Sequence, residues 1–199
     1  QEVHVERCPV LLLVPMKMYL EALPARSPCC SCVSEFELEV NDQKVIGSYE
    51  IPWGWGWQEV HVELDLEERT AQYSLEWGDW FGHSLLWKDT TVSNEPVVGV
   101  ADATGVLTTY WELQLPSSGR RASLEYEGYF LTDMILLSRR GETLARVSER
   151  GCCPGWGWQI ATHGEGRAID LNIEDAVFVG LVFDKIVSQR RQQSASATQ

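Results

Sequence analysis

Two pairs of adjacent arginines are the residues of this sequence best suited to bind an anion. They are Arg120-Arg121 and Arg139-Arg140, in the turns on either side of an expected strand at residues 122–130. A guanidinium group can donate two parallel hydrogen bonds to a phosphate or carboxylate. The four side chains could form one site for a phosphate group, such as a lipid headgroup, or they could be solvated turn charges.

Tryptophans recur in two short GWGW motifs, at residues 54–57 and 155–158. Because side chains alternate along a strand, the tryptophans of one motif would share one face. Such a face could stack on a sugar ring or insert into a lipid interface. Alternatively, it could pack on a helix inside a barrel, with glycine where the strand bends. Exposure of the indole rings decides between the two. The candidates for a sugar platform are Trp55, Trp57, Trp156 and Trp158.

Three carboxylates close to Asn172 could bind a hard cation such as calcium, which prefers oxygen ligands. They are Asp170, Glu174 and Asp175, and their spacing is not that of an EF-hand loop. The same residues suit the start of a helix, with Asn172 as N-cap and acids in the first turn. We therefore expect no bound metal, and we keep these acids as the candidates for a calcium site.

The six cysteines could offer thiolates to zinc, which takes four soft ligands. Neighbouring cysteines rarely bind the same ion, so we expect reduced structural thiols and no metal or other cofactor. The loop cysteines at residues 29–32 could also be acylated if the protein meets a membrane. The full set is Cys8, Cys29, Cys30, Cys32, Cys152 and Cys153.

The last hydrophobic stretch, residues 172–191, has the pattern of a buried helix. Nearly every position from 176 to 187 is apolar, and a helix that is apolar almost all round is enclosed by protein or lipid. The apolar run is shorter than the roughly 20 residues that span a bilayer. The sequence therefore predicts a core helix and no transmembrane segment, with these side chains buried: Phe178, Leu181, Val182 and Phe183.

Almost everything before that helix has the pattern of short strands separated by turn residues. The clearest is residues 58–66, where Val60, Val62 and Leu64 alternate with polar side chains. About a dozen such strands predict an antiparallel barrel or sandwich. We expect one domain over residues 1–191, followed by a disordered polar tail at residues 192–199.

The net charge of −13 at pH 7 argues against generic binding to nucleic acid or to anionic membrane surfaces. Both need a basic surface on the protein. The four histidines have no Ser or Cys partner in a nucleophile motif, so we expect a protein that is not an enzyme. We also expect it to be cytoplasmic, with any membrane contact peripheral and local.

The C-terminal part resembles a known family. The run LEYEGYFLTDMILLSRRGETLARVSER at residues 124–150, the segment WQIATHGEGRAIDLNIED and the apolar helix resemble the C-terminal half of the plant and fungal LURP-one-related proteins. These share the tubby C-terminal-like fold with tubby and the phospholipid scramblases. The residues that carry the resemblance are Gly128, Tyr129, Phe130, Gly141, Ala145, Val147 and Asp184.

The resemblance implies a closed antiparallel β-barrel of about twelve strands around the C-terminal helix. From the residues themselves we expect a binding or adaptor protein, with membrane lipids or another protein as partner and the four arginines as the contacts to a lipid headgroup. A carbohydrate-binding β-domain and a scramblase-like, calcium-responsive lipid transporter are the alternatives. Activity does not follow from fold, because the basic pocket of tubby and the N-terminal tail of scramblases have no counterpart in this sequence.

Overall fold

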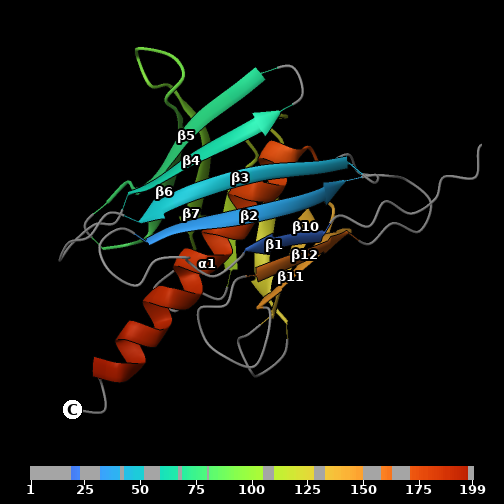
Figure 1. Cartoon of the computed structure of the whole chain (residues 1–199). Coiled ribbons are helices and arrows are strands. Elements are labelled where there is room, and N and C mark those ends of the chain that lie inside the picture. The colour runs from blue at the N-terminus through green and yellow to red at the C-terminus, as the bar shows by residue number, and fades with distance from the viewer. Residues whose placement is uncertain are drawn as a thin grey trace, which may run out of the picture.

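The computed structural model describes residues 19–22, 32–40, 43–51, 59–66, 69–79, 81–104, 110–127, 133–149, 158–162 and 171–196. Of these it gives the backbone alone for residues 19–51, 65, 66, 162, 188 and 191–196. In this part of the chain the strands form one antiparallel sheet, and a single helix follows them (Figure 1). The prediction of a mainly β, antiparallel protein with one C-terminal helix is confirmed.

The strands lie in the sheet in the same order as in the chain, so each pairs with the strand before it. Two irregularities interrupt the ladders, between Trp87 and Lys88 and between Leu136 and Leu137. The strands are β1 (Tyr19–Ala22), β2 (Cys32–Val40), β3 (Gln43–Ile51), β4 (Val60–Leu66), β5 (Arg69–Trp77), β6 (Ser84–Asp89), β7 (Val97–Ala103), β8 (Tyr110–Gln114), β9 (Arg121–Tyr126), β10 (Asp133–Ser138), β11 (Thr143–Glu149) and β12 (Trp158–Thr162).

Alternating side chains give the sheet one buried and one solvated face. In β4 the side chains of Val60, Val62 and Leu64 are buried, whereas His61 and Glu63 are exposed. The alternation predicted for this strand is confirmed. The buried side chains of the sheet point towards the helix and form the core with it.

The helix α1 (Ile173–Ser196) is enclosed along its first half. Every residue from 176 to 183 is buried, although these positions cover all sides of a helix. The predicted burial of Phe178, Leu181, Val182 and Phe183 is confirmed, with exposures of 2% or less. Closure of the sheet around the helix into a barrel stays a prediction.

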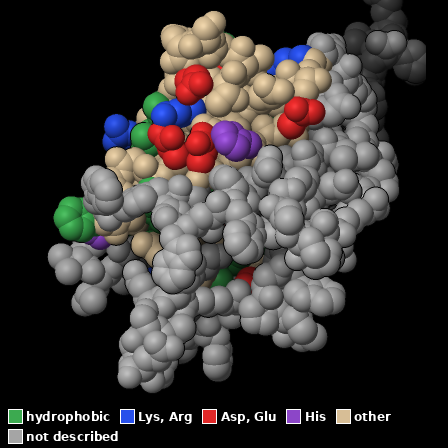
Figure 2. Space-filling view, turned by 60° about the vertical axis from the view of Figure 1, so that its left-hand side comes forward, with side chains coloured by type: hydrophobic (Ala, Val, Ile, Leu, Met, Phe, Trp, Pro, Cys, Tyr) green, Lys and Arg blue, Asp and Glu red, His purple; other side chains and the backbone are tan. Residues whose placement is uncertain are grey.

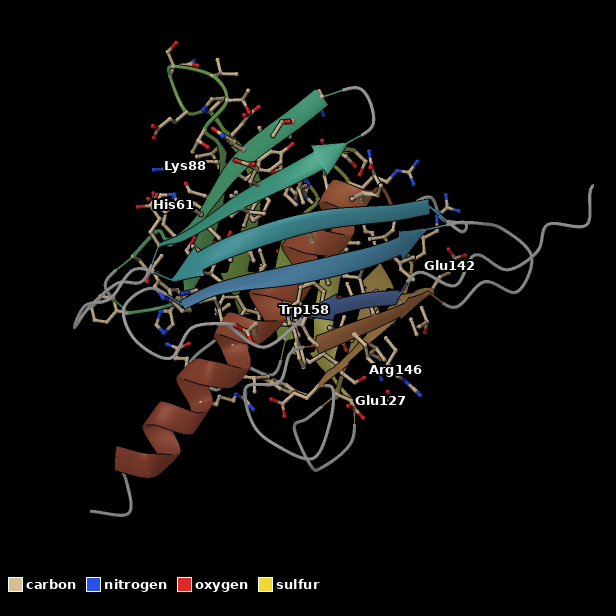
Figure 3. The ribbon with its side chains drawn as sticks, in the orientation of Figure 1. His61, Lys88, Glu127, Glu142, Arg146 and Trp158 are labelled. Atoms are coloured by element: carbon tan, nitrogen blue, oxygen red, sulfur yellow. The ribbon has the colours of Figure 1, made fainter. Side chains whose placement is uncertain are left out.

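The helix α1 approaches the sheet closely at Gly180. Trp158 on β12 is fully buried and lies against this glycine (Figure 3). A Cβ atom at residue 180 would lie only 1.8 Å from Cζ3 of Trp158. The indole ring therefore occupies the space that any larger residue at position 180 would need.

The helix α1 runs past Arg191, the predicted end of the folded domain. The helix continues through residues 192–196, which we expected to be disordered, and ends at Ser196. Gln, Ser and Ala are acceptable helix formers, and no Gly or Pro interrupts the run. A polar composition does not stop a helix that the core has already nucleated.

Candidate functional site

A groove of about 710 Å³ lies on the solvated face of the sheet, over β7 to β10. The strand register brings its lining together. Asp102 on β7 pairs with Glu112 on β8, and Glu112 pairs with Ser123 on β9. The neighbouring side chains Trp111, Leu113 and Leu124 point to the core and are buried. The groove therefore has a firmly packed floor and a lining of polar side chains.

Two of the four predicted arginines, Arg121 and Arg139, line this groove. Ala122 on β9 pairs with Ser138 on β10, so the next residues outward, Arg121 and Arg139, follow at the same end of the two strands. The position of Arg139 is fixed by the turn after β10, where Ser138 accepts a hydrogen bond from the Gly141 N–H at 2.8 Å. The structure thus brings one arginine of each pair into a common site.

Arg120 and Arg140 are exposed and do not line the groove. Arg120 precedes β9 and Arg140 lies in the turn after β10, so neither belongs to the paired strands under the groove. The structure therefore brings together only Arg121 and Arg139 of the four predicted arginines, and an anion site there stays a prediction.

Carboxylates line the other part of the groove, and the sequence pattern does not single them out. Glu125 lies opposite Tyr110. Glu112, two residues after Tyr110 on β8, lies opposite Asp102 on β7. Ser84 donates a hydrogen bond to Asp102 at 2.7 Å, and Ser123 donates one to Glu125 at 3.0 Å. The alternation of Tyr110, Glu112 and Gln114 was visible in the sequence, but their neighbours on β9 depend on the register.

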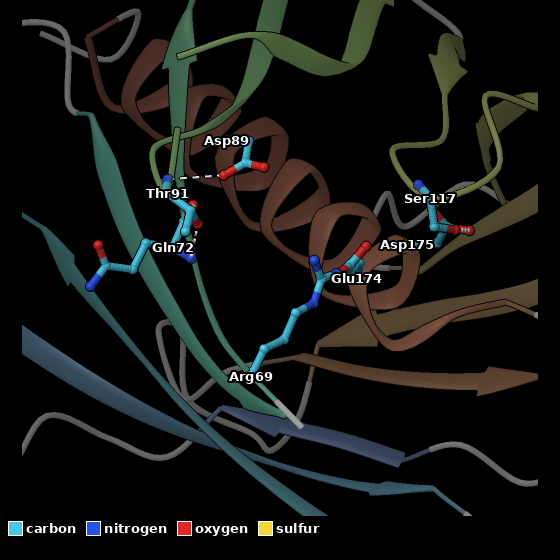
Figure 4. A network of polar contacts seen from close by, with 7 residues as sticks. All are labelled: Arg69, Gln72, Asp89, Thr91, Ser117, Glu174 and Asp175. Carbon is cyan, nitrogen blue, oxygen red and sulfur yellow. Dashed lines mark hydrogen bonds and ion pairs between the residues drawn. The ribbon is translucent and has the colours of Figure 1, made fainter. Parts of the chain in front are cut away.

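The two described acids of the calcium candidate are engaged by the sheet (Figure 4). Arg69 Nη2 lies 2.6 Å from Glu174 Oε1, and Ser117 donates hydrogen bonds to Asp175 from its backbone N–H at 2.9 Å and its hydroxyl at 2.5 Å. Burial and a hydrogen bond to Glu174 raise the pKa of the Tyr73 phenol well above its usual value. These contacts fasten the start of α1 to β5 and to the turn before β9.

Asp170 lies outside the described residues. Among the residues that the structure does describe, no group of three His, Cys, Asp or Glu side chains is placed to hold a metal ion. Of the six cysteines, only Cys32 falls in the described part, as the first residue of β2. The prediction of reduced thiols therefore stays a prediction.

Asp175 gives the stability of the protein a specific pH dependence. Burial raises the pKa of Asp175 above its usual value, and the hydrogen bonds from Ser117 act in the opposite direction. The folded protein thus holds this proton more tightly than the unfolded chain does. The Asp175 contribution to the free energy of unfolding must fall as the pH rises from the unfolded pKa, about 4, through the folded pKa.

We expect Asp175→Asn to gain stability relative to the wild type over that pH window, because the amide cannot ionise and keeps one oxygen that accepts a hydrogen bond from Ser117. Urea unfolding at half-unit pH steps measures the difference, which isolates Asp175 from the other carboxylates. A difference that stays constant from about pH 4 to pH 7 would contradict this assignment.

Of the predicted sugar platform, the structure describes only Trp158, and it contradicts that member. The side chain is fully buried against α1, so it cannot stack on a ligand. Trp55, Trp57 and Trp156 lie outside the described residues.

The described part of the chain contains no helix with the length and apolar character needed to cross a bilayer. Comparison with known proteins identifies no protein family, curated protein or solved structure that matches this chain. The likeness to LURP-one-related and tubby proteins therefore rests on the sequence features alone.

Proposed function

We propose that this is a non-enzymatic binding or adaptor protein that holds a phosphate group, such as that of a membrane lipid headgroup, at Arg121 and Arg139. The single observation that carries the proposal is the position of these two arginines at one end of a 710 Å³ groove. Two guanidinium groups side by side are suited to share the oxygens of one phosphate.

The proposal includes a closed barrel of the tubby type, with about twelve strands around α1. Two observations support closure. The first and last strands, β1 and β12, lie side by side (Figure 1), and α1 is buried on all its sides over residues 176–183. A closed sheet leaves no unpaired edge and would explain why the helix needs no second layer of protein around it.

The proposed setting is the cytoplasmic surface of a membrane, which the protein would contact through the groove alone. The net charge of −13 opposes adsorption to anionic lipids over a broad surface. Figure 2 shows several acidic side chains gathered beside a histidine on one face of the molecule. Recognition would therefore be local and directed at one headgroup.

Changing both groove arginines tests the proposal. We expect Arg121→Ser with Arg139→Ser to weaken binding to phospholipid vesicles at least tenfold, because both phosphate contacts are lost. The matched control is Arg120→Ser with Arg140→Ser, which removes the same charge from the same turns but leaves the groove intact. It should change the affinity less than threefold in vesicle sedimentation assays.

Equal losses in the two double variants would show that only the net charge matters. No loss in either would show that the groove does not bind phosphate. Both variants should keep the wild-type melting temperature, since all four side chains are exposed.

A further inference from the structure

The groove on β7 to β10 keeps opposite charges apart. Arg121 and Glu125 are four residues apart on β9, which corresponds to about 13 Å along a strand. Glu112 lies opposite Ser123, halfway between them. One end of the groove is therefore basic, and the middle and the other end are acidic.

These charges do not neutralise each other. Elsewhere on the sheet, Lys88 pairs with Glu76, and Arg146 pairs with Glu127 (Figure 3). By contrast, neither Arg121 nor Arg139 forms an ion pair with any carboxylate that the structure describes. The groove thus offers separate positive and negative contacts to a ligand.

Electrostatics then limits the kind of ligand. A simple anion at the arginines is repelled by Asp102, Glu112 and Glu125, and a simple cation at the carboxylates is repelled by the arginines. A molecule that carries both charges is attracted at both ends. Tyr110, opposite Glu125, adds an aromatic side chain at the acidic end, which suits an ammonium group.

We propose that the ligand of this groove is a zwitterionic phosphate ester, with its phosphate at Arg121 and Arg139 and its ammonium group at Glu112, the carboxylate nearer to the arginines. Ethanolamine phosphate and choline phosphate have this chemistry, both as free esters and as the headgroups of lipids. The inference rests on the proposed phosphate site and adds the second half of the ligand.

Calorimetric titration of the full chain with three small probes tests the charge requirement. The probes are ethanolamine phosphate, inorganic phosphate and ethanolamine. We expect ethanolamine phosphate to bind at least tenfold more tightly than either of the other two, because only this probe engages the arginines and Glu112 at once. Choline phosphate, measured in the same way, tells whether the ammonium must donate hydrogen bonds.

The carboxylates are tested by Glu112→Gln with Glu125→Gln. This variant should bind ethanolamine phosphate about tenfold more weakly and inorganic phosphate more tightly, since repulsion of a lone anion is relieved. The matched control is Glu95→Gln with Glu142→Gln, which removes two exposed carboxylates that do not line the groove. It should leave both affinities within twofold of the wild type.

The outcomes separate this inference from the proposed function. If phosphate and ethanolamine phosphate bind equally well and the Gln variant binds both more tightly, the groove is a general anion site, and the zwitterion inference is wrong. If no phosphate compound binds, the proposed function is wrong as well. Vesicles of phosphatidylethanolamine and phosphatidylcholine, compared with the free esters, identify a lipid headgroup or a soluble ester as the source.

Discussion

Gly180→Ala should destabilise the protein by about 3 kcal/mol, the upper part of the range for overpacking a core. The added Cβ would lie 1.8 Å from Cζ3 of Trp158 and 1.9 Å from Cη2, far inside van der Waals contact. Trp158 has no free space to move into, because it is fully buried. The higher helix propensity of alanine, worth about 1 kcal/mol over glycine, offsets only part of the strain.

A double-mutant cycle with Trp158→Leu identifies the cause. Leucine removes the indole ring, so the cost of Gly180→Ala should fall below about 1 kcal/mol in that background, and the two changes should be strongly non-additive. Urea unfolding of the four proteins gives the coupling free energy. If Gly180→Ala costs the same whether tryptophan or leucine occupies position 158, α1 and β12 do not meet as the structure places them.

The close contact shows where sequence reasoning reaches its limit. A 3.6-residue period places Gly180 on a narrow polar stripe with Asp184 and identifies the buried helix around it. The period says nothing about which strand faces each position. The indole of Trp158 fills the place that glycine leaves, and this match depends on the path of the chain between β12 and α1.

The groove on β7 to β10 could likewise be predicted only in part from the sequence. Alternation within each strand correctly sorts buried from exposed side chains, as in β4 and β8, because it depends only on local geometry. The arginines could be identified from the sequence because they occur as adjacent pairs, Arg120-Arg121 and Arg139-Arg140. Glu112 and Glu125 did not stand out, since their meeting in one site depends on the pairing of β8 with β9.

Phe178→Ala should have an effect at least as large as that of Gly180→Ala and is the strictest test of the enclosed helix. Phe178 is fully buried, and its ring centroid lies 5.7 Å from that of Trp87, which itself stacks on Tyr73 at 5.0 Å. Truncation removes the transfer free energy of the ring and leaves a cavity among these aromatics. We expect a loss of about 3 to 5 kcal/mol.

That loss is comparable with the whole stability of a typical domain, about 5 to 15 kcal/mol. The matched control is Phe81→Ala, because Phe81 is 78% exposed in the turn after β5, and it should change the free energy of unfolding by less than about 0.5 kcal/mol. Urea unfolding of both variants gives the comparison. If Phe178→Ala cost little more than Phe81→Ala, Phe178 would not be packed among Trp87 and Tyr73 as the structure places it. A large difference between the two phenylalanines is expected because the sheet side chains enclose Phe178, a contact that the proposed barrel also requires.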